Sequence, residues 1–195
     1  MLRRRHVFFL IAFLSLIPAG TSHAVKVVAL GIEEVVARAD RIFVGTCVEV
    51  RGERDPEHGI VVTRYTFTVS RPVKGQVGGT VTFRQYGGSA GKRRTVIDGL
   101  PVYRPGEEVV LFLKPDSAWG LTSPVGLFQG RYEVSRDGVS GRKTVVQDLY
   151  APHLSGEALS RAARARSKPA RLSGEGRMDL EDFMGLIEGM VKGER

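Results

Sequence analysis

Cysteine is nearly absent from this sequence of 195 residues, which contains Cys47 alone. One cysteine cannot form an intramolecular disulfide, so an apolar core has to stabilise the folded chain, and the chain is long enough to bury one. Cys47 lies in a run of apolar and β-branched residues. Such a run indicates a small buried side chain and not a reactive thiol.

Residues that ligate metals are also sparse. Beyond residue 24 the histidines are His58 and His153, and the sequence has no CxxC, HxxxH or HxH spacing. These spacings are the ones that bring metal ligands together in the common zinc sites. We therefore expect neither a metal nor a cofactor.

Catalytic residues are not indicated either, because neither histidine lies in a recognisable triad context. Asp98, Glu107 and Glu108 are candidate carboxylates, but residues 105–108 read more simply as a turn that leads into a strand. We expect a non-catalytic protein. A hydrolase that joins His153 to a distant carboxylate is the least favoured alternative.

Residues 87–94, GGSAGKRR, resemble the start of a phosphate-binding loop. The pattern G-x-x-x-x-G-K-[ST] needs four residues between its glycines, whereas here they enclose three, and Arg93 stands where a hydroxyl should reach Mg²⁺. The following TVIDGLP cannot form the helix whose amides receive the phosphate. We predict no nucleotide site. Instead we expect a positively charged loop between strands, and Lys92, Arg93 and Arg94 are its candidate partner-binding residues.

The long apolar run of the sequence lies at its start. Arg3, Arg4 and Arg5 precede the run at residues 7–17, and Ser22-His23-Ala24 follows it with small residues at the −3 and −1 positions of a cleavage site. This order predicts a signal peptide over residues 1–24 and export to the periplasm or beyond. A short anchor that stays attached is the alternative. The run is too short to span a bilayer, which takes about 20 residues.

Residues 25–150 are expected to form one mainly β domain. Alternating and β-branched segments predict strands after a short amphipathic helix at residues 30–39: these strands are residues 41–51, 60–69, 80–86, 109–113, 125–134 and 144–147. The strand count and the Gly/Pro turns favour a small five-stranded barrel of the oligonucleotide/oligosaccharide-binding (OB) type. An immunoglobulin-like sandwich is the alternative, but this sequence lacks the paired cysteines that would support that fold.

Residues 151–195 change to a basic linker followed by an amphipathic C-terminal helix. The linker carries a basic tract that could bind an anionic envelope surface: Arg161, Arg164, Arg166, Lys168 and Arg171. Asp179 is placed to cap the helix, whose apolar residues recur on one face. That face is expected to dock on the barrel, and contact with a membrane or a partner is the alternative.

Several segments resemble a netrin-like module. They are ADRIFVG at residues 39–45, YTFTV at residues 65–69, VKG at residues 73–75 and GEEVVLF at residues 106–112. The netrin-like superfamily includes the tissue inhibitors of metalloproteinases and many uncharacterised exported bacterial proteins. The resemblance implies an OB-fold barrel that binds a protein, with a secreted protease among the partners. Those inhibitors bind the catalytic zinc of the protease through an N-terminal cysteine. A chain that begins at Val25 has no cysteine there, so this mechanism is not carried over.

The sequence therefore predicts an exported, non-catalytic binding module that contacts a protein partner through loops between its strands. Without Arg3, Arg4 and Arg5 of the predicted signal peptide the formal net charge falls from +8 to +5 (8 − 3). This mild positive excess suits an anionic partner, and nucleic acid is not expected outside the cell. A module held to the cell envelope by the basic tract is the alternative.

Overall fold

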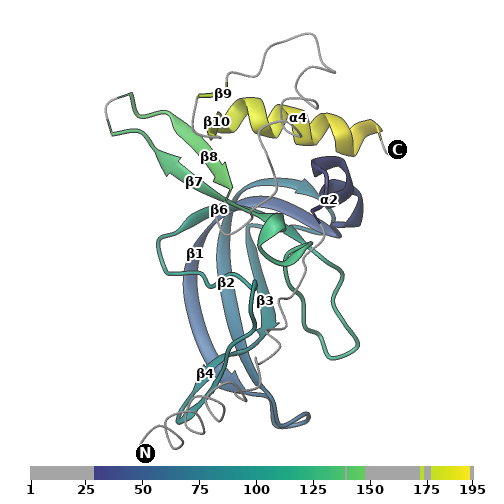
Figure 1. Ribbon diagram of the computed structural model, residues 1–195, viewed down its shortest axis with the longest axis vertical. Coiled ribbons are helices and arrows are strands. Elements are labelled where there is room, and N and C mark those ends of the chain that lie inside the picture. The colour runs from purple at the N-terminus through teal and green to yellow at the C-terminus, as the bar shows by residue number, and fades with distance from the viewer. Residues whose placement is uncertain (1–28, 139, 148–171, 174–176, 194–195) are drawn as a thin grey trace, which may run out of the picture.

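The computed structural model describes residues 29–138, 140–147, 172–173 and 177–193 (Figure 1). Its elements are α2 (Ile32–Arg38), β1 (Arg41–Arg54), β2 (Val61–Lys74), β3 (Thr80–Tyr86), β4 (Gly88–Ala90), β5 (Arg93–Thr95), β6 (Glu108–Leu113), the 3-10 helix η1 (Leu127–Gly130), β7 (Arg131–Arg136), β8 (Lys143–Gln147), β9 (Leu172–Ser173), β10 (Arg177–Asp179) and α4 (Leu180–Gly193). The predicted signal peptide and the basic tract lie outside the described residues.

Most of these strands belong to one antiparallel sheet, in the order β3-β2-β1-β6-β7-β8-β10-β9, and β4 pairs with β5 in a separate hairpin. A mainly β fold is therefore confirmed. Within the described residues the sheet does not close into the expected five-stranded barrel. Part of the edge of β3 that a closing strand would need is occupied by another segment. Arg84 forms a β-bridge with Leu121, and its carbonyl accepts a hydrogen bond from the Thr122 N–H at 2.9 Å.

Three predicted strands differ from the observed ones. Residues 52–59 were expected to form a turn, but β1 continues to Arg54. Pro72 and the residues after it were expected to end a strand, but β2 continues to Lys74. Strand β3 pairs with β2 only up to Thr68, so Pro72 lies where this pairing has ended and a proline is tolerated. Residues 125–134 were expected to be one strand, but η1 precedes β7. Gly126, at φ 62°, supplies the left-handed conformation that turns the chain there.

The predicted alternation in β2 and β3 is confirmed by burial. Val61, Tyr65 and Phe67 of β2 are buried, as are Val81 and Phe83 of β3. Together with other aromatic and aliphatic side chains, Tyr65, Phe67, Val81 and Phe83 belong to one of two hydrophobic clusters. The same alternation places Gln85, the next inward position of β3, among buried residues.

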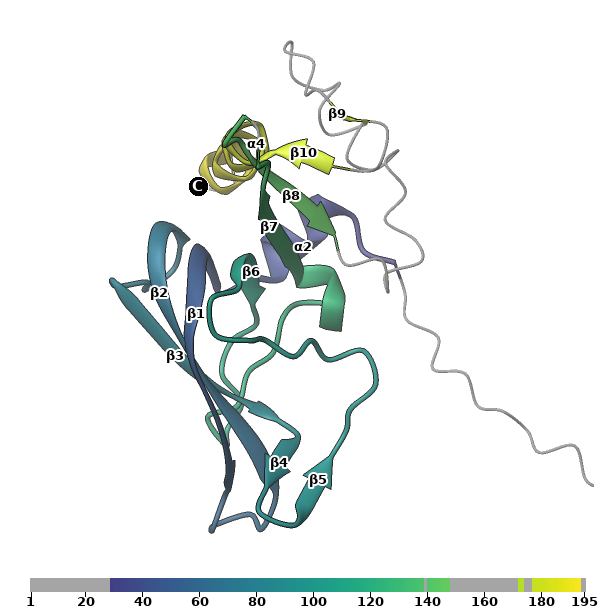
Figure 2. The ribbon, with the colours of Figure 1, turned by 90° about the vertical axis from the view of Figure 1, so that its left-hand side faces the viewer.

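The C-terminal helix α4 packs in the other cluster, so its apolar face is docked on the rest of the fold as expected. The buried Phe183 ring lies 4.7 Å from the Tyr132 ring and 6.5 Å from the Phe112 ring, measured between centroids. Asp179 caps the helix, because its carboxylate accepts the Glu181 N–H at 2.9 Å. Helices α2 and α4 lie together at one end of the molecule, and the β4–β5 hairpin lies at the other end (Figure 2).

Candidate functional site

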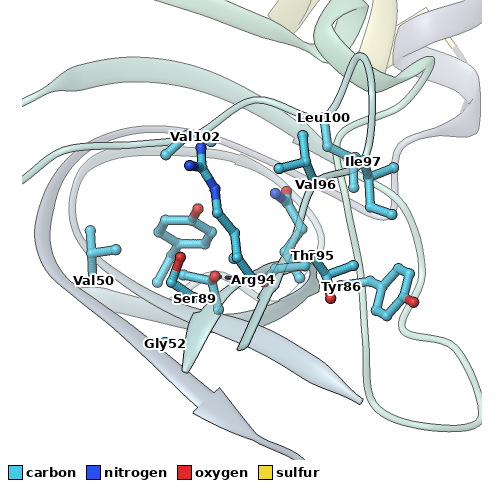
Figure 3. Close-up of a pocket in the computed structure, with 15 residues that line it drawn as sticks. Val50, Gly52, Tyr86, Ser89, Arg94, Thr95, Val96, Ile97, Leu100 and Val102 are labelled. Atoms are coloured by element: carbon cyan, nitrogen blue, oxygen red, sulfur yellow. Dashed lines mark hydrogen bonds between the residues drawn. The ribbon is translucent and has the colours of Figure 1, made fainter. Parts of the chain in front are cut away.

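A pocket of about 350 Å³ lies at the hairpin end of the molecule (Figure 3). Its walls come from the sheet, the β4–β5 hairpin and the segment after the hairpin: Val50, Gly52, Thr63, Tyr65, Gln85, Tyr86, Gly87, Gly88, Ser89, Arg94, Thr95, Val96, Ile97, Leu100 and Val102. The volume falls in the range of pockets that bind small molecules or single side chains.

Glycines hold the hairpin against the sheet. A Cβ built on Gly52 would lie 1.8 Å from the Ser89 carbonyl oxygen, and one built on Gly88 would lie 1.9 Å from Thr63 Oγ1. The Thr63 hydroxyl donates a hydrogen bond to the Gly87 carbonyl at 2.7 Å. Only glycine permits these approaches, so Gly88 of GGSAGKRR serves the packing of the hairpin against the sheet and not a phosphate.

The segment with Lys92, Arg93 and Arg94 is thus part of a paired β-hairpin, where a permissive loop was expected. Ser89 pairs with Arg94 and Ala90 with Arg93, while Gly91, at φ 59°, turns the chain between the strands. The three charges are placed differently: Arg94 lines the pocket, whereas Lys92, in the turn before β5, and Arg93 do not. All three residues are exposed, and none forms an ion pair with another described residue.

Apolar side chains beside the pocket are unusually exposed. Val96 and Val102 expose 66% and 73% of their surface, and Tyr86 is also exposed. Tyr65 is buried, and this burial raises the pKa of its phenol. Figure 3 shows Val96, Ile97 and Leu100 grouped at one side of the pocket, with the Arg94 side chain extended across it.

Gln85 is the buried polar side chain of this site, with 4% of its surface exposed. Its Nε2 donates a hydrogen bond to the Pro101 carbonyl at 2.9 Å. Its Oε1 has no hydrogen-bond partner among the described residues. Sequence reasoning missed this residue, although the inward positions of β3, Val81 and Phe83, already pointed to a glutamine on the buried face.

The expectation of a non-catalytic protein included the absence of a G-x-S-x-G nucleophile elbow, and this part of it is wrong, because residues 87–91 match that pattern. In an elbow the serine sits between a strand and a helix, whereas Ser89 lies in the middle of β4. The lining of the pocket contains no imidazole, carboxylate or thiol that could serve as its base.

The other candidate groups have structural partners. Glu107 pairs with Arg131, and Glu108 accepts Lys143 Nζ at 2.7 Å. Burial, together with the nearby Glu107 carboxylate, raises the pKa of the Cys47 thiol to about 11. This thiol therefore stays protonated at neutral pH.

His58 belongs to a cluster outside the pocket. Its Nδ1 lies 3.3 Å from the buried Asp55 carboxylate, and its ring stacks on Trp119 at a centroid distance of 4.2 Å. Arg84 contacts the same carboxylate at 3.3 Å. This cluster joins the β1–β2 turn to the segment that covers the edge of β3. His153, the other histidine considered for catalysis, lies outside the described residues.

Among the described residues, no three or more His, Cys, Asp or Glu side chains are arranged to hold a metal ion. No helix in that part of the chain combines the length and the apolar character needed to cross a membrane. Comparison with protein-family models, with curated proteins and with solved structures found no match to this chain.

Proposed function

We propose that this chain is an exported, non-catalytic binding module that engages a protein partner through the β4–β5 hairpin and the adjoining segment 96–102. The observation that carries the proposal is the exposure of Val96 and Val102 beside a preformed pocket. Exposed apolar side chains next to a pocket are typical of interaction sites. The netrin-like resemblance supports the same role and adds a secreted protease as the class of partner.

Charge on the hairpin supports an acidic partner surface. Lys92, Arg93 and Arg94 follow one another, are exposed and have no carboxylate paired to them among the described residues. Such a patch accelerates the encounter with an acidic surface more than it strengthens the final complex. Binding is therefore expected to be driven by the apolar side chains and steered by the three cations.

The test is a quantitative pull-down from the medium or periplasm of the producing cell, with the purified protein as bait. Replacing Lys92, Arg93 and Arg94 with alanine should reduce partner capture, and added salt should reduce capture by the unaltered protein. A charge-matched control replaces Arg104, Arg136 and Arg142, which are exposed and lie outside the hairpin and the pocket.

The control variant should retain capture because it loses the same net charge elsewhere. Equal capture by both triple variants and the unaltered protein would remove the hairpin from the binding surface. Equal loss in both would show that net charge alone draws the partner.

A further inference from the structure

The pocket beneath the hairpin has three chemical requirements, and the first is an apolar group. Val50, Val96, Leu100 and Val102 contribute aliphatic side chains to its lining, and Val96 and Val102 remain largely exposed. Burying these surfaces against an apolar side chain removes them from water, which is the main favourable term in association. A volume of about 350 Å³ accepts one large side chain together with its backbone.

The second requirement is a hydrogen-bond donor. Gln85 is 4% exposed, and its Nε2 is already committed to the Pro101 carbonyl, which can only accept. This bond fixes the orientation of the amide, so the atom left without a partner among the described residues is the acceptor Oε1. A buried acceptor without a donor is costly, and a ligand N–H that reaches it recovers that cost on binding.

The third requirement is an anion. Arg94 lines the pocket, its side chain extends across it (Figure 3), and no described carboxylate pairs with it. The lining itself contains no acidic side chain. A guanidinium in this position favours a carboxylate, which it can bind through two N–H groups at once.

One residue of a polypeptide meets all three requirements when it is the last one. Its amide is the N–H donor, its side chain is the apolar group, and its terminal carboxylate is the anion. A fatty acid lacks the N–H for Gln85, and a single apolar residue within a chain lacks the carboxylate for Arg94.

We propose that this pocket binds the carboxyl-terminal end of a partner polypeptide whose last residue is apolar. The inference rests on the proposed function, since it names the part of the partner that enters the site. It assigns the anchoring role to Arg94, Gln85 and Val102, and leaves Lys92 and Arg93 to steer the encounter.

The test measures binding of a fluorescent peptide of four glycines and a terminal leucine, in its free-acid form and as the C-terminal amide. The free acid should bind about tenfold more tightly, as expected for one charge-assisted hydrogen-bonded pair. Arg94→Gln should abolish this preference. Arg104→Gln removes an exposed arginine outside the pocket and should preserve it.

Two further variants test the other requirements. Val102→Asp should abolish peptide binding, whereas Val48→Asp, at an exposed valine outside the pocket lining, should leave it intact. Gln85→Leu should weaken binding of the peptide and leave binding of octanoate unchanged, because octanoate has no N–H to donate. Thermal unfolding of each variant confirms that it is folded before its binding is compared.

Equal affinity for acid and amide would overturn the assignment to a chain end. Octanoate that binds as tightly as the peptide would overturn it in favour of an aliphatic carboxylate. If neither the free-acid peptide nor its amide binds at millimolar concentration, the assignment would also be overturned. Partner capture that still depends on Lys92 and Arg93 while the peptide does not bind would refute the pocket inference and leave the proposed function standing.

Discussion

Gly52 of β1 lies directly against the carbonyl oxygen of Ser89 in β4, so closely that a Cβ on Gly52 would be 1.8 Å from that oxygen. This contact joins the long strands of the sheet to the hairpin that carries the three cations. It also fixes the hairpin wall of the pocket, because Gly52 and Ser89 both line it. The position of Arg94 therefore depends on a glycine about forty residues earlier.

Gly52→Ala should displace the hairpin. The added methyl group cannot fit beside the Ser89 backbone, so we expect a destabilisation of about 1–3 kcal/mol and weaker binding of the free-acid peptide. Urea unfolding and the peptide titration measure the two effects. Gly79→Ala is the matched control, because a Cβ there meets no atom within 4 Å. A Gly52→Ala protein with unchanged peptide affinity would show that the hairpin position does not shape the site.

Phe183→Ala should show that α4 is an integral part of the fold. Phe183 is completely buried against Tyr132 and Phe112, so removing its ring should cost about 3–5 kcal/mol in the free energy of unfolding. Lys192→Ala, at an exposed position of the same helix, should have little effect. A loss well under 1 kcal/mol for Phe183→Ala would be incompatible with a docked helix.

Asp55 should make the stability depend on pH in the acidic range. Burial raises the pKa of this carboxyl, but hydrogen bonds from the N–H groups of His58 and Glu57 and the His58 imidazole outweigh it, so the pKa lies below the ordinary value of 3.8. A lowered pKa in the folded state means that the ionised carboxylate stabilises the fold above pH 3.8. This contribution is lost as the pH falls through the folded pKa.

Asp55→Asn tests this dependence. Asparagine keeps an oxygen for the turn but loses the charge that faces His58 and Arg84. Urea unfolding should show the variant less stable than the unaltered protein at about pH 7, with the difference shrinking towards pH 2. A difference that stays constant over this range would mean that the charge of Asp55 does not contribute.

The basic tract makes a separate prediction from the sequence. The tract should bind anionic vesicles through its five cations: Arg161, Arg164, Arg166, Lys168 and Arg171. Each cation near the surface contributes about 1 kcal/mol of binding free energy. Binding should weaken as added salt shortens the Debye length. Sedimentation with phosphatidylglycerol vesicles at low and high salt measures this. Replacing all five with glutamine should abolish it, and the hairpin triple-alanine variant should retain it. Sedimentation that salt does not change would end the envelope alternative.

Local signals in the sequence predicted the local structure well. Alternation predicted where β2 and β3 begin and which face of each is buried, because successive side chains of a strand point to opposite faces of the sheet. Asp179 marked the start of α4, because a capping side chain acts within one helical turn. Pro72 misled the prediction, since whether a proline is tolerated depends on which partner strand lies beside it.

The sequence by itself determined a mainly β chain with a basic segment at GGSAGKRR and a docked amphipathic helix at its C-terminal end. Only the tertiary structure decided that the sheet stays open within the described residues, that Ser89 and Gly88 of this segment lie against Gly52 and Thr63, and that Arg94 alone of the three cations lines a pocket. It also decided that Gln85 Oε1 is buried without a partner among the described residues. The reason is physical: periodicity and capping act over a few neighbouring residues, whereas these features arise between segments that are brought together only when the chain folds.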